Sequence, residues 1–447
     1  MSTTRRSNEV HAHLPVHLQP ITLSRSETVY EKSSAPFTLD KRFVDSFRLR
    51  TPPFGFNGLG ELVYQRTYSR VKDDGEKEQW VDTLERVVNG TFQMQQEHIE
   101  KYTLGWNPEK AQESAQEMFT RMFDMRFLPP GRGLYSMGSE LTTKRRIFSS
   151  LNNCGFVSTE KMCEDPSDPF LFLFDMSMLG CGIGFDLKGA GTVLIQGPKN
   201  SSDTKSNEST FVVPDCREGW VEALKRLLDA YFFKGVKPSY DFSQIRPYGA
   251  PIKGFGGVAS GPQALVDLLK DVEIVLDRRI GQAITVTDIV DIQNLIGRAV
   301  VSGNVRRTAE IAFGDAHSEE FLNLKNYKKN PEREAWGWTS NNSVFGEIGM
   351  DYSHIADSIV INGEPGIAWL DNMKRYSRMN GSDAEYKDYR VKGGNPCLGR
   401  IYSIRLSITT DTSNISLLYS PFFFSILFTC TYVCCFTEQS LESYELW

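Results

Sequence analysis

The segment that most constrains this chain is an uncharged apolar run near its end. Residues 415–436 contain no Asp, Glu, Lys or Arg, and they include three consecutive phenylalanines and three cysteines. Roughly 20 apolar residues can span a bilayer as a helix, but Pro421 and the scattered Ser and Thr side chains make this run a poor helix former. Its origin therefore decides how the residues on either side are joined.

Three explanations of the wider segment, residues 399–437, remain open: a translated intron, a membrane anchor and a genuine loop. We favour the intron, because a pyrimidine-rich tract before a splice acceptor is translated mainly as Phe, Ser, Leu, Tyr and Cys, which are frequent here. The codons of residues 399–400 and 437–438 allow a donor and an acceptor in one frame, and splicing there would place Glu438 directly after Leu398. Trp447 has a similar explanation. A codon that ends an exon in TG and is read on into a second splice donor becomes a Trp codon followed by a stop codon.

Composition limits the class of protein. With 447 residues, 40% of them hydrophobic and 24% charged, the chain can bury a large core over two or three domains. The formal net charge of −6 argues against a nucleic-acid partner. Eight cysteines without a regular framework indicate a reducing compartment, and the six histidines form no cluster spaced for a metal. We expect a cytoplasmic protein without metal ligands and, if the apolar run is an intron, without membrane contact.

The first third of the chain is expected to be a leader followed by a helical domain. Residues 1–40 are polar and unpatterned, and they lack the apolar core of a secretory signal, which predicts a disordered leader. Residues 41–145 carry apolar side chains at three- and four-residue spacing, as expected for helices. The Pro-Pro-Gly turn at residues 129–131 should end the last long helix of this domain.

From residue 146 the pattern changes to short apolar strands that alternate with amphipathic helices, which predicts an α/β core. Thr285 or Thr287 is placed to cap one of these helices. The expected core faces of three helices consist of Trp220, Leu224, Leu227, Leu228 and Tyr231; of Leu265, Leu268, Leu269 and Val272; and of Ile289, Ile292, Leu295, Ile296 and Ala299.

Several phrases in this α/β part together resemble one known family. They are Leu151-Asn152-Asn153-Cys154-Gly155-Phe156-Val157-Ser158, Arg246-Pro247-Tyr248-Gly249, Gly254-Phe255-Gly256-Gly257-Val258-Ala259-Ser260-Gly261-Pro262, Ser302-Gly303-Asn304-Val305-Arg306-Arg307-Thr308-Ala309-Glu310, Ser340-Asn341-Asn342-Ser343-Val344 and Asn362-Gly363-Glu364-Pro365-Gly366-Ile367. Their order resembles the monomeric, adenosylcobalamin-dependent ribonucleoside-triphosphate reductases of the ribonucleotide reductase family. The resemblance extends to Asn395-Pro396-Cys397-Leu398, which Glu438 would continue after removal of residues 399–437.

The resemblance implies an α/β fold: a ten-stranded α/β barrel with a central finger loop, preceded by a helical cap and incomplete in this chain. The implied division is a leader (1–40), a helical domain (41–145), the first part of the barrel with an effector-site insertion (146–398), the expected intron product (399–437) and a resumed finger-loop segment (438–447).

The implied reaction converts ribonucleoside triphosphates to 2′-deoxyribonucleoside triphosphates. Adenosylcobalamin would be the radical source, thioredoxin the final reductant and a deoxynucleoside triphosphate the allosteric effector. A monomer is expected, because in this branch the insertion forms the effector site within one chain.

The resemblance also assigns roles to individual residues. Cys397 would carry a thiyl radical that takes a hydrogen atom from ribose C3′, Glu438 would be the general base on the 3′-hydroxyl, and Asn395 would hold the ribose hydroxyls. Cys154 would protonate the leaving 2′-hydroxyl and end in a disulfide, whose second thiol is expected at the position of Trp447. Without the family, a lone cysteine on an apolar strand is usually a small core residue. That structural role is expected of Cys163, Cys181 and Cys216.

A loop after the third amphipathic helix is the expected link between effector and substrate. It contains Ser302, Gly303, Asn304, Arg306 and Arg307. Taken alone, the two arginines would be a solvated pair, although their position beside a glycine and after a buried helix suits an anion-binding loop. The resemblance implies that this loop carries effector identity to the substrate site.

The run Gly180-Cys181-Gly182-Ile183-Gly184 is a weak glycine signal by itself. We expect it to permit close backbone packing near a nucleotide.

Two rival hypotheses remain. The chain could be the large subunit of a reductase activated by a separate radical-generating partner, although it lacks the N-terminal ATP-binding helical module expected there. It could also be a nucleotide-binding fragment without catalysis, because the molecule as written lacks the cobalamin-facing remainder of the barrel and the C-terminal shuttle cysteines that the resemblance implies.

Overall fold

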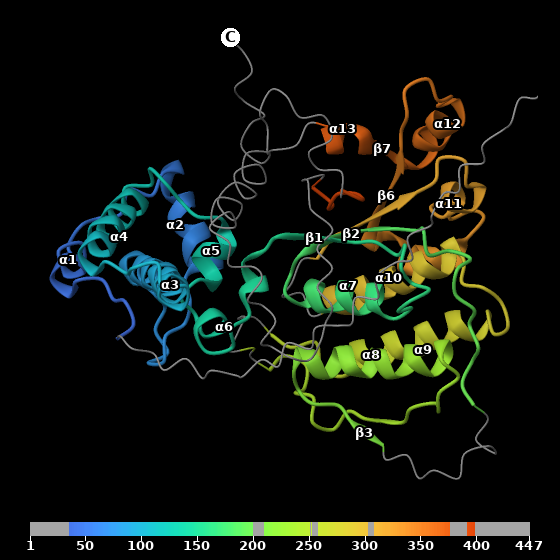
Figure 1. Ribbon diagram of the computed structural model, residues 1–447, viewed down its shortest axis with the longest axis horizontal. Coiled ribbons are helices and arrows are strands. Elements are labelled where there is room, and N and C mark those ends of the chain that lie inside the picture. Colours follow the sequence, from blue (N-terminus) through green and yellow to red (C-terminus); the bar gives the residue numbers. More distant parts are fainter. Residues whose placement is uncertain are drawn as a thin grey trace, which may run out of the picture.

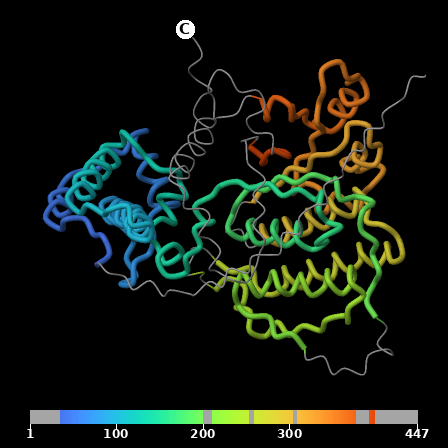
Figure 2. The backbone as a smooth tube through the Cα atoms, in the orientation of Figure 1, coloured from blue at the N-terminus to red at the C-terminus, as the bar shows by residue number. Residues whose placement is uncertain are grey.

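The structure is a computed structural model that describes residues 35–199, 210–250, 252, 258–302, 308–375 and 391–397. A helical part, blue to cyan in Figure 1, lies beside an α/β part that runs from green to orange. The backbone trace shows the same two parts (Figure 2). The predictions for residues 1–34, for Gly303, Asn304, Arg306 and Arg307, and for everything after Cys397, including Glu438 and Trp447, lie outside the described residues.

The described N-terminal part is helical, as its apolar spacing predicts. Its α-helices are α1 (Lys41–Asp45), α2 (Leu59–Val63), α3 (Trp80–Lys101), α4 (Pro108–Phe123), α5 (Gly131–Ser136) and α6 (Glu140–Thr143). Helix α4 starts where the Asn107 side chain accepts a hydrogen bond from the Lys110 N–H, and Pro108 takes the first helical position, where no N–H is needed. Its buried Ala115 and Phe119 belong to the core cluster that α4 shares with α3.

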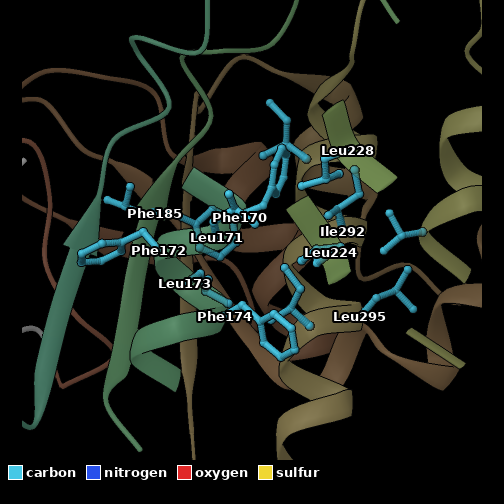
Figure 3. Close-up of a cluster of buried hydrophobic side chains, with 14 of the residues drawn as sticks. Phe170, Leu171, Phe172, Leu173, Phe174, Phe185, Leu224, Leu228, Ile292 and Leu295 are labelled. Carbon is cyan, nitrogen blue, oxygen red and sulfur yellow. The ribbon is translucent and has the colours of Figure 1, made fainter. Parts of the chain in front are cut away.

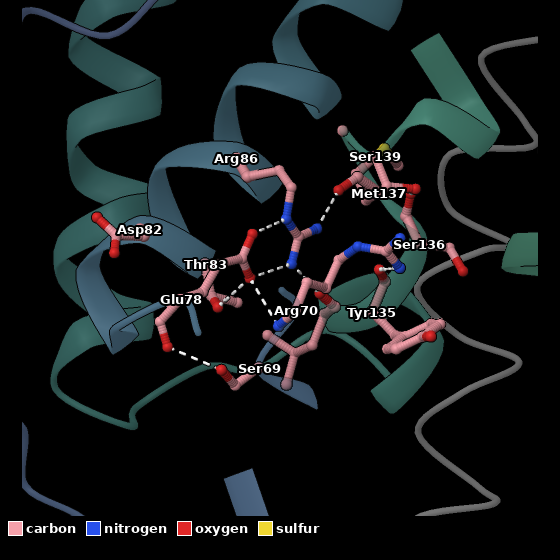
Figure 4. Close-up of polar contacts among 12 residues, drawn as sticks. Ser69, Arg70, Glu78, Asp82, Thr83, Arg86, Tyr135, Ser136, Met137 and Ser139 are labelled. Carbon is pink, nitrogen blue, oxygen red and sulfur yellow. Dashed lines mark hydrogen bonds and ion pairs between the residues drawn. The ribbon is translucent and has the colours of Figure 1, made fainter. Parts of the chain in front are cut away.

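A buried ion pair fixes α5 to α3 (Figure 4). Glu78 is 6% exposed and receives hydrogen bonds from Arg86 Nε at 2.6 Å and Nη2 at 2.9 Å. The same guanidinium donates to the carbonyl oxygens of Leu134 and Met137, at the end of α5. A charge pair removed from water needs such a complete set of partners. Helices α3 and α5 of the helical part are thereby fixed to one another.

The α/β part is built on one parallel sheet in which spatial order follows chain order, so each strand pairs with the next. Its strands are β1 (Cys154–Val157), β2 (Gly182–Asp186), β5 (Glu310–Gly314), β6 (Ser340–Phe345) and β7 (Gly366–Ala368). A separate pair consists of β3 (Phe211–Val212) and β4 (Tyr240–Asp241). The predicted α/β class is confirmed, and the described residues supply five strands of an open sheet where a complete barrel was expected to have ten.

Helices connect these strands, as parallel pairing requires. They are α7 (Asp168–Met178), α8 (Arg217–Phe232), α9 (Gln263–Asp277), α10 (Val286–Val301), α11 (Glu319–Asn323) and α12 (Ser353–Asn362), with α13 (Leu370–Arg375) after β7. Helices α7 and α10 pack against one face of the sheet, and α8 and α9 form a second layer behind them (Figure 1). Thr285 caps α10 through a capping box with Asp288, which confirms one of the two predicted caps.

The main core lies between the sheet and these helices. Helix α7 is apolar on nearly all sides because it is enclosed: Phe170 and Phe174 are fully buried, close to Leu224 of α8 and Ile292 of α10 (Figure 3). The predicted helix faces are buried, except that Trp220 is only partly covered. Within the described residues, the structure has no helix that is both long and apolar enough for a membrane crossing.

Candidate active site

The candidate site lies on the face of the sheet opposite α7 and α10. There the segment 391–397 crosses β1 and β2 at very short range. The carbonyl oxygen of Gly394 occupies the space that a β-carbon on Gly184 would need, and a β-carbon on Gly182 would lie 3.4 Å from Pro396 Cδ. The prediction that the glycines of this run permit close backbone packing is confirmed, and the backbone that they admit is the turn that carries Cys397.

Cys154 is placed at the same end of the same strands. It is the first residue of β1 and pairs in register with Gly182, against which Pro396 packs. Successive side chains of a strand point to opposite faces, so Cys154 shares the face of Phe156, whose ring lies against Gly393. Cys154 is partly buried and Cys397 is exposed. The fold therefore brings these two predicted cysteines, far apart in sequence, to one strand end.

Asn395 is the most enclosed polar residue of the turn. Its side chain is completely buried, and neither its amide nitrogen nor its amide oxygen has a hydrogen-bond partner among the described residues. Buried amides are normally paired, because an unpaired one keeps its full desolvation cost. The position therefore suits a ligand that can both donate and accept hydrogen bonds, as sugar hydroxyls do.

One stem of the predicted effector loop ends beside this site. Ser302 follows α10, and its hydroxyl donates to the carbonyl of Ala299 at 2.7 Å. On the other side, the Thr308 hydroxyl donates to the carbonyl of Cys181 at 2.9 Å, directly before β2. The loop's exit is thus hydrogen-bonded to the strand that borders Cys154.

Two supporting residues were not found from the sequence. Arg132 of α5 donates to the carbonyl oxygens of Leu179 (2.6 Å) and Gly180, at the end of α7, and so ties the helical part to the start of β2. Cationic donors suit helix C-termini, where carbonyls lack partners. The second supporting residue is Thr308, through its bond to Cys181 described above. An Arg after a Pro-Pro-Gly turn carries no sequence signal for this role, because the acceptors are 47 and 48 residues away.

Comparisons with known proteins identify the family of this chain. A model of the ribonucleotide reductase alpha domain matches residues 39–139, and a model of the B12-dependent ribonucleotide reductase insertion domain matches residues 193–276. A probable adenosylcobalamin-dependent ribonucleoside-triphosphate reductase of Dictyostelium discoideum is 52% identical over 387 residues, covering 84% of this chain and 51% of the relative. The adenosylcobalamin-dependent ribonucleoside-triphosphate reductase of Euglena gracilis is 52% identical over 378 residues, covering 84% of this chain and 51% of that relative.

A solved structure extends the likeness to three dimensions. The crystal structure of a B12-dependent (class II) ribonucleotide reductase superposes with a TM-score of 0.67 at 32% identity, covering 82% of this chain and 57% of that one. The fold is that of a ribonucleotide reductase. The chain belongs to the B12-dependent branch of that family. It spans about half the length of the curated relatives it matches.

Proposed function

We propose that the uninterrupted protein reduces ribonucleoside triphosphates to 2′-deoxyribonucleoside triphosphates. The observation that carries this proposal is the turn 394–397, which lies on Gly182 and Gly184 beside Cys154. The relatives are named as adenosylcobalamin-dependent ribonucleoside-triphosphate reductases, which supports the substrate and the cofactor.

The proposed chemistry assigns one task to each residue. The Cys397 sulfur, exposed at the turn, takes the hydrogen atom from ribose C3′ as a thiyl radical and returns it at the end of the reaction, while Asn395 holds the ribose hydroxyls. Glu438 accepts the 3′-hydroxyl proton, and Cys154 gives a proton to the leaving 2′-hydroxyl, which departs as water. Two thiols lose two electrons to the substrate and become a disulfide, with the second thiol at the position of Trp447. Adenosylcobalamin supplies the initiating radical when bound.

The molecule as written is proposed to be interrupted at its reactive turn. Residues 399–437 separate Cys397 from Glu438, and we interpret them as translated intron. A base displaced by a few ångströms loses most of its effect. This form is therefore expected to bind nucleotide without reducing it.

Regulation and partners follow from the family. A deoxynucleoside triphosphate is the proposed effector, acting near the insertion at residues 193–276 through the loop with Ser302, Gly303, Asn304, Arg306 and Arg307. Thioredoxin is the proposed reductant, and the protein is proposed to be a cytoplasmic monomer divided at the domain boundaries given above.

A cysteine substitution tests the proposal. In the uninterrupted protein, Cys397→Ser should abolish deoxynucleotide formation and leave effector binding unchanged, because an alcohol O–H bond is too strong to replace the thiyl. The exposed Cys163 gives a matched control, and Cys163→Ser should retain full turnover. Substantial reduction by Cys397→Ser would remove that residue from its assigned role.

A further inference from the structure

A buried carboxyl group joins the two elements that flank the effector loop, on the face of the sheet away from the candidate site. Glu310 begins β5 and is 1% exposed, and Asn294 of α10 is completely buried. Asn294 Nδ2 donates to Glu310 Oε2 at 3.1 Å. This contact bridges the helix that leads into residues 303–307 and the strand that leads out.

The second oxygen atom of each side chain has no hydrogen bond if Glu310 is ionised. Glu310 Oε1 and Asn294 Oδ1 both lack a hydrogen-bond partner among the residues that the structure describes, and both are acceptors in that state. A proton on the carboxyl group turns one of them into a donor. The neutral acid and the amide can then form two hydrogen bonds. The second bond would join Glu310 Oε1 and Asn294 Oδ1 and would satisfy both atoms.

The surroundings favour the neutral form. Burial raises the pKa of the Glu310 carboxyl well above its ordinary value. Among the described residues, the cation that acts on Glu310 is Lys325. It donates to the carbonyls of Gly337 and Ser340 and lies 3.4 Å from Glu364 Oε2, so its charge is already balanced. On α10, one turn before Asn294, Asp291 is likewise paired with Arg333.

A glycine makes room for this carboxyl group. Gly297 lies one turn after Asn294 on α10, and a β-carbon there would overlap Glu310 Oε1. The Thr339 hydroxyl donates to the Asn294 carbonyl at 3.1 Å, which fixes the same turn of helix to the residue before β6. The carboxyl group thus sits directly against the helix backbone.

We propose that Glu310 and Asn294 form a neutral acid–amide pair that sets the spacing of the two stems of the effector loop, and so acts as a positioning element for effector-dependent substrate choice. The second half of this statement rests on the proposed function. The first half concerns only described residues and is tested separately.

Infrared difference spectroscopy on the 447-residue chain tests the protonation state. A carboxylic-acid C=O band at neutral pH should be present and should disappear in Glu310→Gln. The control is Asp186→Asn: Asp186 is equally buried, but its oxygens accept from Ser158 and Thr159. Loss of the band in Glu310→Gln alone supports the pair. An unchanged band in Glu310→Gln would overturn it.

Substrate choice in the uninterrupted protein tests the positioning role. Glu310→Gln preserves both hydrogen bonds of the pair and should keep the parent's base preference under each effector. Asn294→Leu removes both hydrogen bonds and should change the preference about five-fold, within the range by which remote residues alter coupling. Equal changes in both variants, or none in Asn294→Leu, would contradict the role. A parent protein that forms no deoxynucleotide would defeat the proposed reaction but not the infrared result.

Discussion

Gly184 and Gly394 meet backbone to backbone: the carbonyl oxygen of Gly394 fills the space that a β-carbon on Gly184 would occupy. This approach holds the Cys397 turn against the strand that pairs with the Cys154 strand. It explains why a glycine is needed in the interior of β2, where glycine otherwise weakens a strand.

Gly184→Ala should therefore displace the turn and reduce turnover of the uninterrupted protein by about 100-fold, since a shift of about 1 Å at a reacting group has an effect of that size. Gly55→Ala is the control, because a β-carbon at Gly55 meets no atom within 4 Å. Steady-state rates and nucleotide affinity should be measured together. A Gly184→Ala protein with parental turnover would show that the close approach is dispensable.

Removing the largely buried guanidinium of Arg86 should destabilise the helical part. Arg86→Ala leaves the Glu78 carboxylate buried without its partner and frees the Leu134 and Met137 carbonyls, which should cost about 3–5 kcal/mol. Arg121, which pairs with Glu117 on the exposed face of α4, provides the comparison, and Arg121→Ala should cost less than about 1 kcal/mol. Urea unfolding measures both values, and similar losses would count against the buried ion pair.

The two loop arginines are expected to serve regulation more than chemistry. Each charge-assisted contact to a nucleotide is worth about 3 kcal/mol at most. Arg306→Ala and Arg307→Ala should therefore weaken the preference for one base that each effector imposes. Turnover without effector should change less. Competition assays with mixed ribonucleoside triphosphates measure this. Unchanged effector-dependent preferences would refute the assignment.

Glu310 should give folding stability a specific pH dependence. Its pKa is raised in the folded state, chiefly by burial, so the folded state keeps the proton in a range where the unfolded state has lost it. Stability then falls as pH rises through that range. Glu310→Gln has no such proton, so the free energy of unfolding of this variant should increase relative to that of the parent as the pH rises above the ordinary carboxyl pKa of 4.5. A difference that is constant with pH would contradict a protonated Glu310.

The sequence predicted those features that depend on local pattern. The apolar spacing identified the buried faces of α8, α9 and α10, and the glycine run at residues 180–184 predicted close packing correctly. Family resemblance selected Cys154, Asn395 and Cys397, but their meeting at one strand end depends on strand register, which no local pattern contains.

The supporting contacts could not be predicted because they join residues from separate elements. Arg132 reaches carbonyls beyond α7, and Glu310 meets Asn294 across the effector loop. Each contact exists only after the helices have packed on the sheet. The carboxyl group of Glu310 in particular would be assigned to the surface from its charge alone.

The most direct test of the account compares the 447-residue chain with the uninterrupted protein. The latter lacks residues 399–437, carries Trp447→Cys and continues into the downstream sequence of the transcript. Both are supplied with adenosylcobalamin, effector, ribonucleoside triphosphate and a dithiol reductant, and deoxynucleotide is quantified. We predict product from the uninterrupted protein and none from the 447-residue chain. Measurable reduction by the 447-residue chain, or none by an uninterrupted protein that binds nucleotide, would contradict the account.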